Sequence, residues 1–327
     1  MKDVETYQAS QLEGIILNAN ERTTNVDEKV LDKICERIRK ADLNRYPDDG
    51  CKRLKKIYAD SIGKEAACVL AGNGSDQMLG LMIQLFTGKG RPLAVIDPDF
   101  SMYDYYAGMQ EAEVKKYASL DEMKNSSAGL FVFSNPNNPT GKVIDRDTVL
   151  AFCDAVAPAP VIVDEAYMDF GDESVLNDIE AHKNLYVTRT LSKAYGAAGI
   201  RCGFLVSSKE NIGQIEPYHV PYSVSVLDQI AAEAVLEAGR PYLEEVRQER
   251  DRMFEALNGL PVFPSGANFL FLKGECMAEL GQYLASSGIH VRTWPGKDQI
   301  RITIGTPAEN DQVISVINNW RKDHAHR

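Results

Sequence analysis

The sequence predicts an α/β fold with a large, mostly parallel sheet domain and a smaller α+β domain. Short apolar runs rich in β-branched residues alternate with longer helical patterns through the middle of the chain, which is typical of strands buried on both faces. With 327 residues and 44% hydrophobic content, the chain is long enough for a second domain. The predicted strands of the large domain cover residues 67–70, 92–96, 129–133, 161–163, 184–190 and 203–206.

Helical patterns lie between and after these runs. Residues 75–86 and 145–156 have apolar side chains at helical spacing and begin with acidic or hydroxyl residues, as helices do. Two further helical patterns surround a Gly-Arg-Pro break at 239–241. The smaller unit is predicted to hold strands at 268–272, 289–292 and 300–304 and helices at about 276–286 and 308–321.

These patterns divide the chain into four parts. The helix of the first part has one apolar face, and we expect it to pack on the small domain. The parts are an N-terminal arm and helix (1–44), a large α/β domain (45–220), connecting helices (221–258) and a small C-terminal α+β domain (259–327).

Composition favours a small-molecule ligand. The net charge of −11 and the lack of a basic block argue against nucleic acid or an anionic membrane as partner. No apolar run reaches the roughly 18 to 20 residues that span a bilayer, and the start lacks the apolar core of a signal peptide, so a cytoplasmic protein is expected. The six cysteines form no C-x-x-C pair, and we expect neither disulfides nor a metal site.

Polar residues follow the predicted strands, where ligands bind in open α/β sheets. The turn Gly74-Ser75-Asp76 opens a helix and is a candidate phosphate cradle, since helix N-termini attract anions. The turn also resembles a dinucleotide fingerprint, although Gln77 stands where the third glycine would be, and a structural helix cap is a third alternative.

The other strand ends favour one cofactor over these alternatives. Lys193 follows a strand and is flanked by small residues, so it is either a surface charge or a nucleophile held in place. A phosphate cradle, a stacking aromatic, a carboxylate, hydrogen-bonding side chains and a lysine nucleophile together describe a pyridoxal phosphate site. The residues that make up this set are Gly74, Ser75, Asp76, Phe100, Asn138, Asp164, Tyr167, Thr190, Ser192, Lys193 and Arg201.

Three motifs carry a specific resemblance. Residues 135–141 (NPNNPTG), 164–167 (DEAY) and 190–193 (TLSK), with Arg201, are similar to class I/II aminotransferases of fold type I. The histidinol-phosphate aminotransferase branch is the closest, and the match runs from about residue 16 to 306 in order. The additional segments that resemble this branch are 17–21, 44–48, 72–76 and 301–306.

The resemblance implies a role for each residue around the cofactor ring. Lys193 would carry pyridoxal phosphate as an internal Schiff base and then act as the base that moves the substrate proton. Asp164 would keep the ring nitrogen protonated, so that the ring remains an electron sink. Asn138 and Tyr167 would bond the ring oxygen, and Phe100 would lie over the ring.

The resemblance also implies how the phosphate is held and how the protein assembles. Thr190, Ser192, Arg201 and the N–H groups around Ser75 and Asp76 would bind the cofactor phosphate. Tyr46 would reach the cofactor phosphate of the neighbouring subunit, which implies a homodimer with shared sites.

Substrate recognition is expected from four residues. Arg301 matches the position that takes a substrate carboxylate, and Arg292 matches a second arginine of the same branch; Asn20 and Arg22 lie in the N-terminal motif, where Arg22 departs from the usual pattern. The implied reaction converts L-histidinol phosphate and 2-oxoglutarate to the imidazole acetol phosphate and L-glutamate, in histidine biosynthesis. Alternatives are a threonine-phosphate decarboxylase, an aminotransferase for aromatic or other amino acids, and a regulator that binds the cofactor without catalysis.

Overall fold

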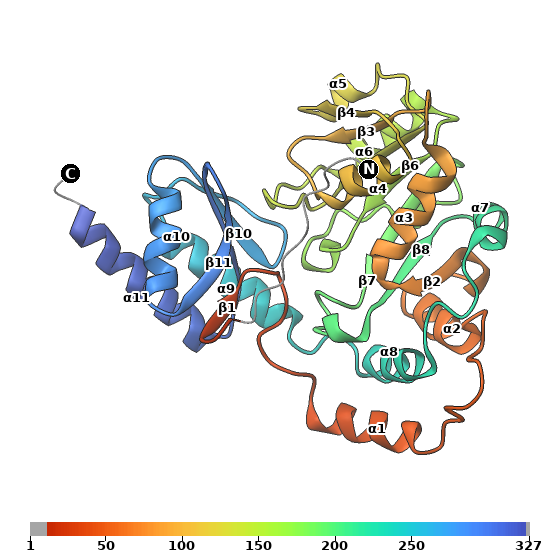
Figure 1. Ribbon diagram of the computed structural model, residues 1–327, viewed down its shortest axis with the longest axis horizontal. Coiled ribbons are helices and arrows are strands. Elements are labelled where there is room, and N and C mark those ends of the chain that lie inside the picture. The colour runs from red at the N-terminus through yellow and green to blue at the C-terminus, as the bar shows by residue number, and fades with distance from the viewer. Residues whose placement is uncertain (1–11, 325–327) are drawn as a thin grey trace.

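A seven-stranded sheet forms the centre of the large domain in the computed structural model, which describes residues 12–324 (Figure 1). Strands β4, β3, β5, β6 and β7 run parallel, whereas β8 is antiparallel to both β7 and β2. The predicted mostly parallel sheet is confirmed. In spatial order, the strands are β2 (Val69–Asn73), β8 (Cys202–Val206), β7 (Leu185–Thr190), β6 (Val161–Asp164), β5 (Leu130–Ser134), β3 (Leu93–Ile96) and β4 (Val114–Tyr117).

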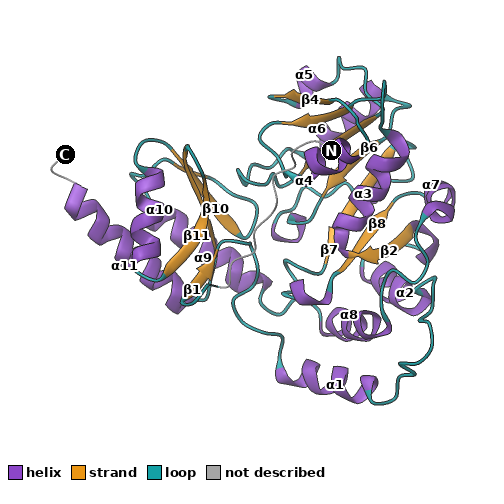
Figure 2. Cartoon of the chain, viewed as in Figure 1, coloured by secondary structure: helices purple, strands orange, loops and turns teal. Residues whose placement is uncertain are grey.

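Helices cover both faces of this sheet (Figure 2). Because side chains alternate along a strand, Phe131 and Phe133 of β5 enter one apolar core while Leu130 and Val132 enter the other. The first core includes α2 (Lys52–Ser61), α5 (Leu120–Met123), α6 (Arg146–Val156) and α8 (Val226–Ala238). The second includes α3 (Gly74–Phe86), α4 (Met102–Met109) and α7 (Lys209–Ile215).

The small domain lies beside the large one and has its own sheet and core (Figure 1). Its strand order is β1-β11-β12-β10-β9, with β1 parallel to β11 and the other pairs antiparallel. The strands are β1 (Ile15–Leu17), β9 (Val262–Phe263), β10 (Phe269–Lys273), β11 (Ile289–Trp294) and β12 (Lys297–Thr303). The helices of this core are α9 (Leu243–Ala256), α10 (Met277–Ser286) and α11 (Pro307–His324).

The N-terminal helix, α1 (Glu28–Ile38), does not pack on the small domain, and that expectation is wrong. It lies along α8 of the large domain (Figure 1), where Arg37 contacts Glu237 at 2.8 Å and Lys33 pairs with the same carboxylate. The basic side chains of α1 pair with acidic side chains near the C-terminal end of α8. These ion pairs add to the contact that the narrow apolar face of α1 makes with the large domain. Among the described residues of the N-terminal part, β1 joins the small sheet as a strand, and Asn20 bonds Thr303 and Asn268 of the same domain.

Three short strands escaped prediction: β1, β4 and β9. Strand β4 has the sequence Val-Lys-Lys-Tyr, which lacks the apolar run of its neighbours because it forms the edge of the large sheet. In the part of the chain that the structure describes, no helix could cross a membrane. Nor do three potential metal-binding side chains gather anywhere between residues 12 and 324.

Candidate active site

A cavity of about 720 Å³ lies where the carboxyl ends of β3, β5, β6 and β7 face the small domain. Residues of both domains line it, so the site depends on how the two domains meet. The structure brings together in this cavity the predicted residues Ser75, Asp76, Phe100, Asn138, Asp164, Tyr167, Thr190, Ser192, Lys193, Arg201, Arg292 and Arg301.

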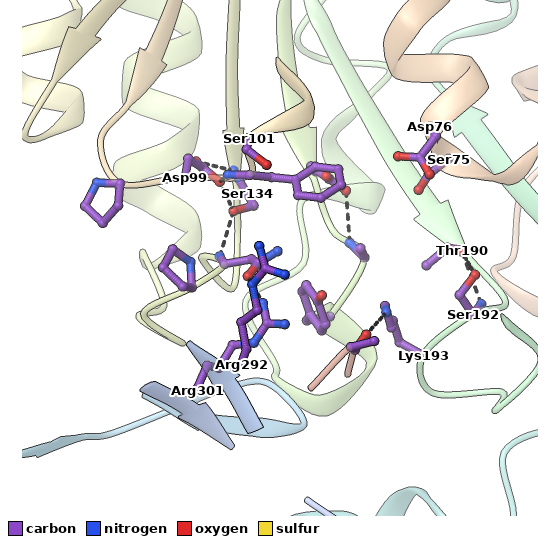
Figure 3. Close-up of a pocket in the computed structure, with 18 of the residues that line it drawn as sticks. Ser75, Asp76, Asp99, Ser101, Ser134, Thr190, Ser192, Lys193, Arg292 and Arg301 are labelled. Carbon is purple, nitrogen blue, oxygen red and sulfur yellow. Dashed lines mark hydrogen bonds between the residues drawn. The ribbon is translucent and has the colours of Figure 1, made fainter. Parts of the chain in front are cut away.

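Lys193 extends into the cavity from the turn after β7 (Figure 3). The turn is closed by hydrogen bonds from the Gly196 N–H to the Lys193 carbonyl at 3.0 Å and from the Ala197 N–H to the Leu191 carbonyl at 3.0 Å. The Lys193 amine donates to the carbonyl oxygen of Ala19 at 2.9 Å. A half-buried amine is therefore held in one place by a backbone acceptor from the N-terminal segment.

Asp164 is the buried carboxylate of the site, at the end of β6. Its Oδ1 accepts from the Thr188 hydroxyl at 2.8 Å and its Oδ2 from the Tyr103 hydroxyl at 2.9 Å. Burial raises the pKa of Asp164 to about 6, and these hydrogen bonds oppose part of that rise. Glu165 faces away from the cavity and pairs with Arg189 at 2.5 Å, so only one carboxylate of this motif is available to a ligand.

An anion cradle forms where α3 begins and β8 passes close to it. Gly74 has φ 75°, and a Cβ at this position would lie 2.7 Å from the Arg201 guanidinium. At Gly203 a Cβ would lie 2.1 Å from the Ser75 nitrogen, so the two backbones touch. The first N–H groups of a helix have no partner within it, and those of α3 meet Arg201 and the Thr190 and Ser192 hydroxyls here.

Two further aromatic residues, Phe100 and Tyr167, line the cavity. Phe100 contacts Tyr103 edge to face, with ring centroids 5.6 Å apart. The Tyr167 hydroxyl accepts a hydrogen bond from the Asn20 amide at 2.9 Å, which leaves its own proton free to point elsewhere. Asn20 is fully buried and does not line the cavity, so it acts on Tyr167 rather than as a wall of the site.

Arg292 and Arg301 stand directly opposite each other on the antiparallel strands β11 and β12. Both extend from the small domain toward the large one (Figure 3). Both also lie near the indole of Trp294, at 5.5 Å and 6.0 Å from its ring centroid. The Arg301 guanidinium donates to the Asn138 side-chain oxygen and, at 2.9 Å, to the Asn18 carbonyl. Two positive charges thus face one end of the cavity.

Besides Asn20, the predicted site residues Arg22 and Tyr46 also lie away from this cavity. Arg22 stacks on Tyr242, with its guanidinium carbon 3.1 Å from the ring centroid, and packs against Gly196 behind the Lys193 turn. Tyr46 is 82% exposed and stacks on Tyr222, so it contributes nothing to the site of its own chain.

Sequence reasoning missed several residues that hold the site together. Tyr103 and Thr188 bond Asp164, and Asp99 bonds Ser134 on the cavity wall. Thr188 had a usable signal, because it is a polar residue within an otherwise buried strand. Asp99 had none, since Asp97 follows the same strand and the sequence does not distinguish the two carboxylates.

A strand-end lysine, a buried carboxylate and an anion cradle on a mixed α/β sheet define the class of this protein. The chain belongs to the aminotransferases of class I and II, whose family description it matches over residues 13–317. It is a pyridoxal-phosphate-dependent aminotransferase, as the motifs implied.

Similar proteins extend the comparison over nearly the whole chain. The histidinol-phosphate aminotransferase of Clostridium novyi is 32% identical, covering 99% of this chain and 97% of that protein. The fold is shared with the histidinol-phosphate aminotransferase of Sinorhizobium meliloti in complex with pyridoxal-5′-phosphate (TM-score 0.84, 24% identity, 94% and 92% of the two chains). It is also shared with the L-threonine-O-3-phosphate decarboxylase of Porphyromonas gingivalis (TM-score 0.82, 24% identity, 94% and 99%).

The residues of this chain fit the cofactor. Without side chains, Gly74 and Gly203 allow the start of α3, β8 and Arg201 to lie close together around the cradle, and Asp164 is a buried carboxylate that three donors hold in place, as a partner for a protonated ring nitrogen would be. When bound, pyridoxal phosphate supplies the electron sink for a substrate carbanion. The chain contributes the anion site, an aromatic wall at Phe100, and an amine at Lys193 that can hold or move a proton.

Proposed function

We propose that this enzyme transfers the amino group of L-histidinol phosphate to 2-oxoglutarate, giving imidazole acetol phosphate and L-glutamate. The observation that carries the proposal is the pair of arginines at opposite positions of β11 and β12, facing the Lys193 amine across the cavity. The curated relatives named for this activity, 32% identical over nearly the full chain in the C. novyi case, support it.

The arginine pair favours a doubly charged anion. Like charges directly opposite on neighbouring strands destabilise a sheet, so Arg292 and Arg301 are best explained by a ligand that neutralises both. A guanidinium matches both phosphate and carboxylate oxygens in bidentate geometry. The same pair can therefore bind the phosphate of one substrate and a carboxylate of the other in the two half-reactions.

Other residues complete the proposed chemistry. Phe100, Asn138 and Tyr167 would hold the cofactor ring, and the Lys193 amine would move the proton at the substrate α-carbon. Phosphate and carboxylate recognition would also suit a threonine-phosphate decarboxylase, and an aromatic donor would suit a broader aminotransferase. Release of carbon dioxide from L-threonine phosphate would identify the first of these alternatives.

The test uses the visible absorption of the holoenzyme during titration with L-histidinol phosphate. We expect the cofactor band to convert to the amino form and 2-oxoglutarate to restore it. For Arg292→Ala, we expect KM for L-histidinol phosphate to rise about 10- to 100-fold, the loss of one charged hydrogen bond, and KM for 2-oxoglutarate to change less. Arg301→Ala should raise both.

The matched control is Arg39→Ala, because Arg39 is an exposed arginine at the end of α1. It should leave both KM values unchanged. A cofactor band that L-histidinol phosphate does not alter would reject the substrate while leaving the class of enzyme in place.

We also propose a cytoplasmic homodimer with shared sites. Exposed apolar side chains in two segments, 43–46 and 218–227, support the dimer; Tyr46 and Tyr222 bring the segments together by stacking, and exposed apolar surface is common at interfaces. These side chains belong to Leu43, Tyr46, Tyr218, Val220, Tyr222 and Leu227. The six unpaired cysteines agree with a reducing compartment.

Complementation between two inactive variants tests the shared site. A Tyr46→Ala chain keeps Lys193, and a Lys193→Ala chain keeps Tyr46. If Tyr46 serves the partner's site, a mixed dimer has one intact site, and mixing the two variants should restore activity that neither shows alone. Recovery no greater than the sum of the separate variants, or a monomer in sedimentation, would reject the shared dimer.

A further inference from the structure

Asp99 joins two loops that line the cavity. It lies one residue before Phe100, in the loop after β3, and its Oδ1 accepts from the Phe100 N–H at 2.8 Å. Its Oδ2 accepts from the Ser134 N–H at 3.0 Å, and Oδ1 also accepts from the Ser134 hydroxyl. Ser134 is the last residue of β5, so one carboxylate fixes the ends of two neighbouring strands.

The hydrogen bonds continue beyond Ser134. Its hydroxyl accepts from the Asn138 N–H at 2.9 Å, and the Asn138 side-chain oxygen accepts from Arg301. Figure 3 shows Asp99 beside Ser134 on the wall of the cavity, with dashed lines that run from one to the other and onward. A continuous series of hydrogen bonds therefore connects Phe100, on the aromatic wall, to Asn138, the residue expected at the ring oxygen. It passes through Asp99 and Ser134.

Keeping a carboxylate at this place is costly for the fold. Asp99 is half-buried and lines the wall of the cavity. Burial, with a smaller contribution from nearby Asp164, raises the pKa of Asp99 to about 8. Residues that reduce stability without serving the core are expected at functional sites.

We propose that Asp99 is a positioning residue that sets the separation of Phe100 and Asn138. Through this separation it determines how tightly the protein binds the cofactor ring. The proposal rests on the pyridoxal phosphate chemistry of the family and not on the identity of the amino donor. It requires no contact between Asp99 and the substrate.

Asp99→Asn tests this role with little change in shape. Both oxygens of a carboxyl group can accept a hydrogen bond, protonated or not, whereas an amide nitrogen cannot, so the NH₂ group of the variant must face either the Ser134 N–H or the donors at Oδ1. We expect the dissociation constant of pyridoxal phosphate, measured by absorbance titration of the apoenzyme, to rise about tenfold. We expect kcat to fall about tenfold as well.

KM for 2-oxoglutarate should stay within about twofold, because Arg301 keeps its second acceptor, the Asn18 carbonyl. Ser134→Ala removes the hydroxyl that donates to Asp99 and accepts from the Asn138 N–H, so it breaks the same link and should give an effect of similar size. In the double variant the two losses should be less than additive, as expected for one network.

Asp172→Asn is the matched control, since Asp172 carries the same charge on a side chain that is 91% exposed. It should leave cofactor binding unchanged. An unchanged dissociation constant for Asp99→Asn, with only a lower melting temperature, would overturn the proposal and leave Asp99 a purely structural residue. A parallel rise in KM would overturn it in favour of direct substrate contact. Cofactor affinity is independent of the donor, so failure of this proposal and of the proposed substrate can be distinguished.

Discussion

Replacing Lys193 with alanine is expected to abolish transamination while the protein still binds pyridoxal phosphate. The anion cradle at Ser75, Thr190, Ser192 and Arg201 does not involve the lysine, so the phosphate contacts remain. The proton transfer loses its base, which lowers the rate by about 10⁴-fold. The rate of one half-reaction, followed by the cofactor band in a stopped-flow instrument, measures this loss.

Lys183→Ala is the control for this variant. Lys183 is a lysine just before β7, with a side chain that is 65% exposed and an amine that pairs with Glu210 at 3.5 Å. It should react like the unmodified protein. A rate for Lys193→Ala within a hundredfold of the unmodified protein would show that another group moves the proton.

Asp164→Asn is expected to have two opposite effects. Catalysis should fall by about 10²- to 10³-fold, because the amide cannot stabilise positive charge on the ring nitrogen as a carboxylate does. The apoenzyme should become more stable at neutral pH. The amide fits the site, since the Tyr103 hydroxyl that donates to Asp164 can instead accept from an NH₂ group.

The pH dependence of stability follows from the pKa of Asp164, which burial raises from 3.8 to about 6. Between these pH values the unfolded chain has lost the proton while the folded chain retains it, so stability falls as pH rises. The asparagine variant lacks this loss, and its advantage in the free energy of unfolding should grow between about pH 4 and 6, to about 3 kcal/mol at most, and stay constant above.

The titration of Asp99 causes a separate fall in the free energy of unfolding of both proteins as pH rises. Because burial raises its pKa to about 8, that decline continues to higher pH, and it largely cancels in the difference between variants because Asp164 is only a minor cause of the raised pKa. Urea unfolding of the two apoenzymes at pH 4, 6 and 8 measures the difference. An advantage for Asp164→Asn that is equal at all three pH values would contradict the raised pKa.

The sequence predicted the parts of the site that follow buried strands. Lys193, Asp164 and Asn138 each come after an apolar run, and parallel strands bring such positions to one edge of the sheet. Local sequence patterns did not determine which domain a helix packs against. Helix α1 has an apolar face whose partner its own sequence does not specify, and in the structure Val30 packs on the core of the large domain while Arg37 pairs with Glu237 of α8.

The register in which the strands pair could not be predicted from the sequence either. The opposition of Arg292 and Arg301 depends on an irregularity between Thr293 and Trp294, which shifts the alignment of β11 and β12. The role of Asp99 depends on which of two loop carboxylates turns inward, a choice made by hydrogen bonds to the neighbouring strand.

The short stretch Asn18-Ala19 has a practical meaning for handling the protein. It connects β1 in the small sheet to α1 on the large domain, and its two carbonyls accept from Arg301 and Lys193. Shortening the chain to begin at α1 would remove a strand of one domain and detach the two essential cations from their common support. A tag is therefore safer at the opposite end, where α11 leads away from the large domain (Figure 1).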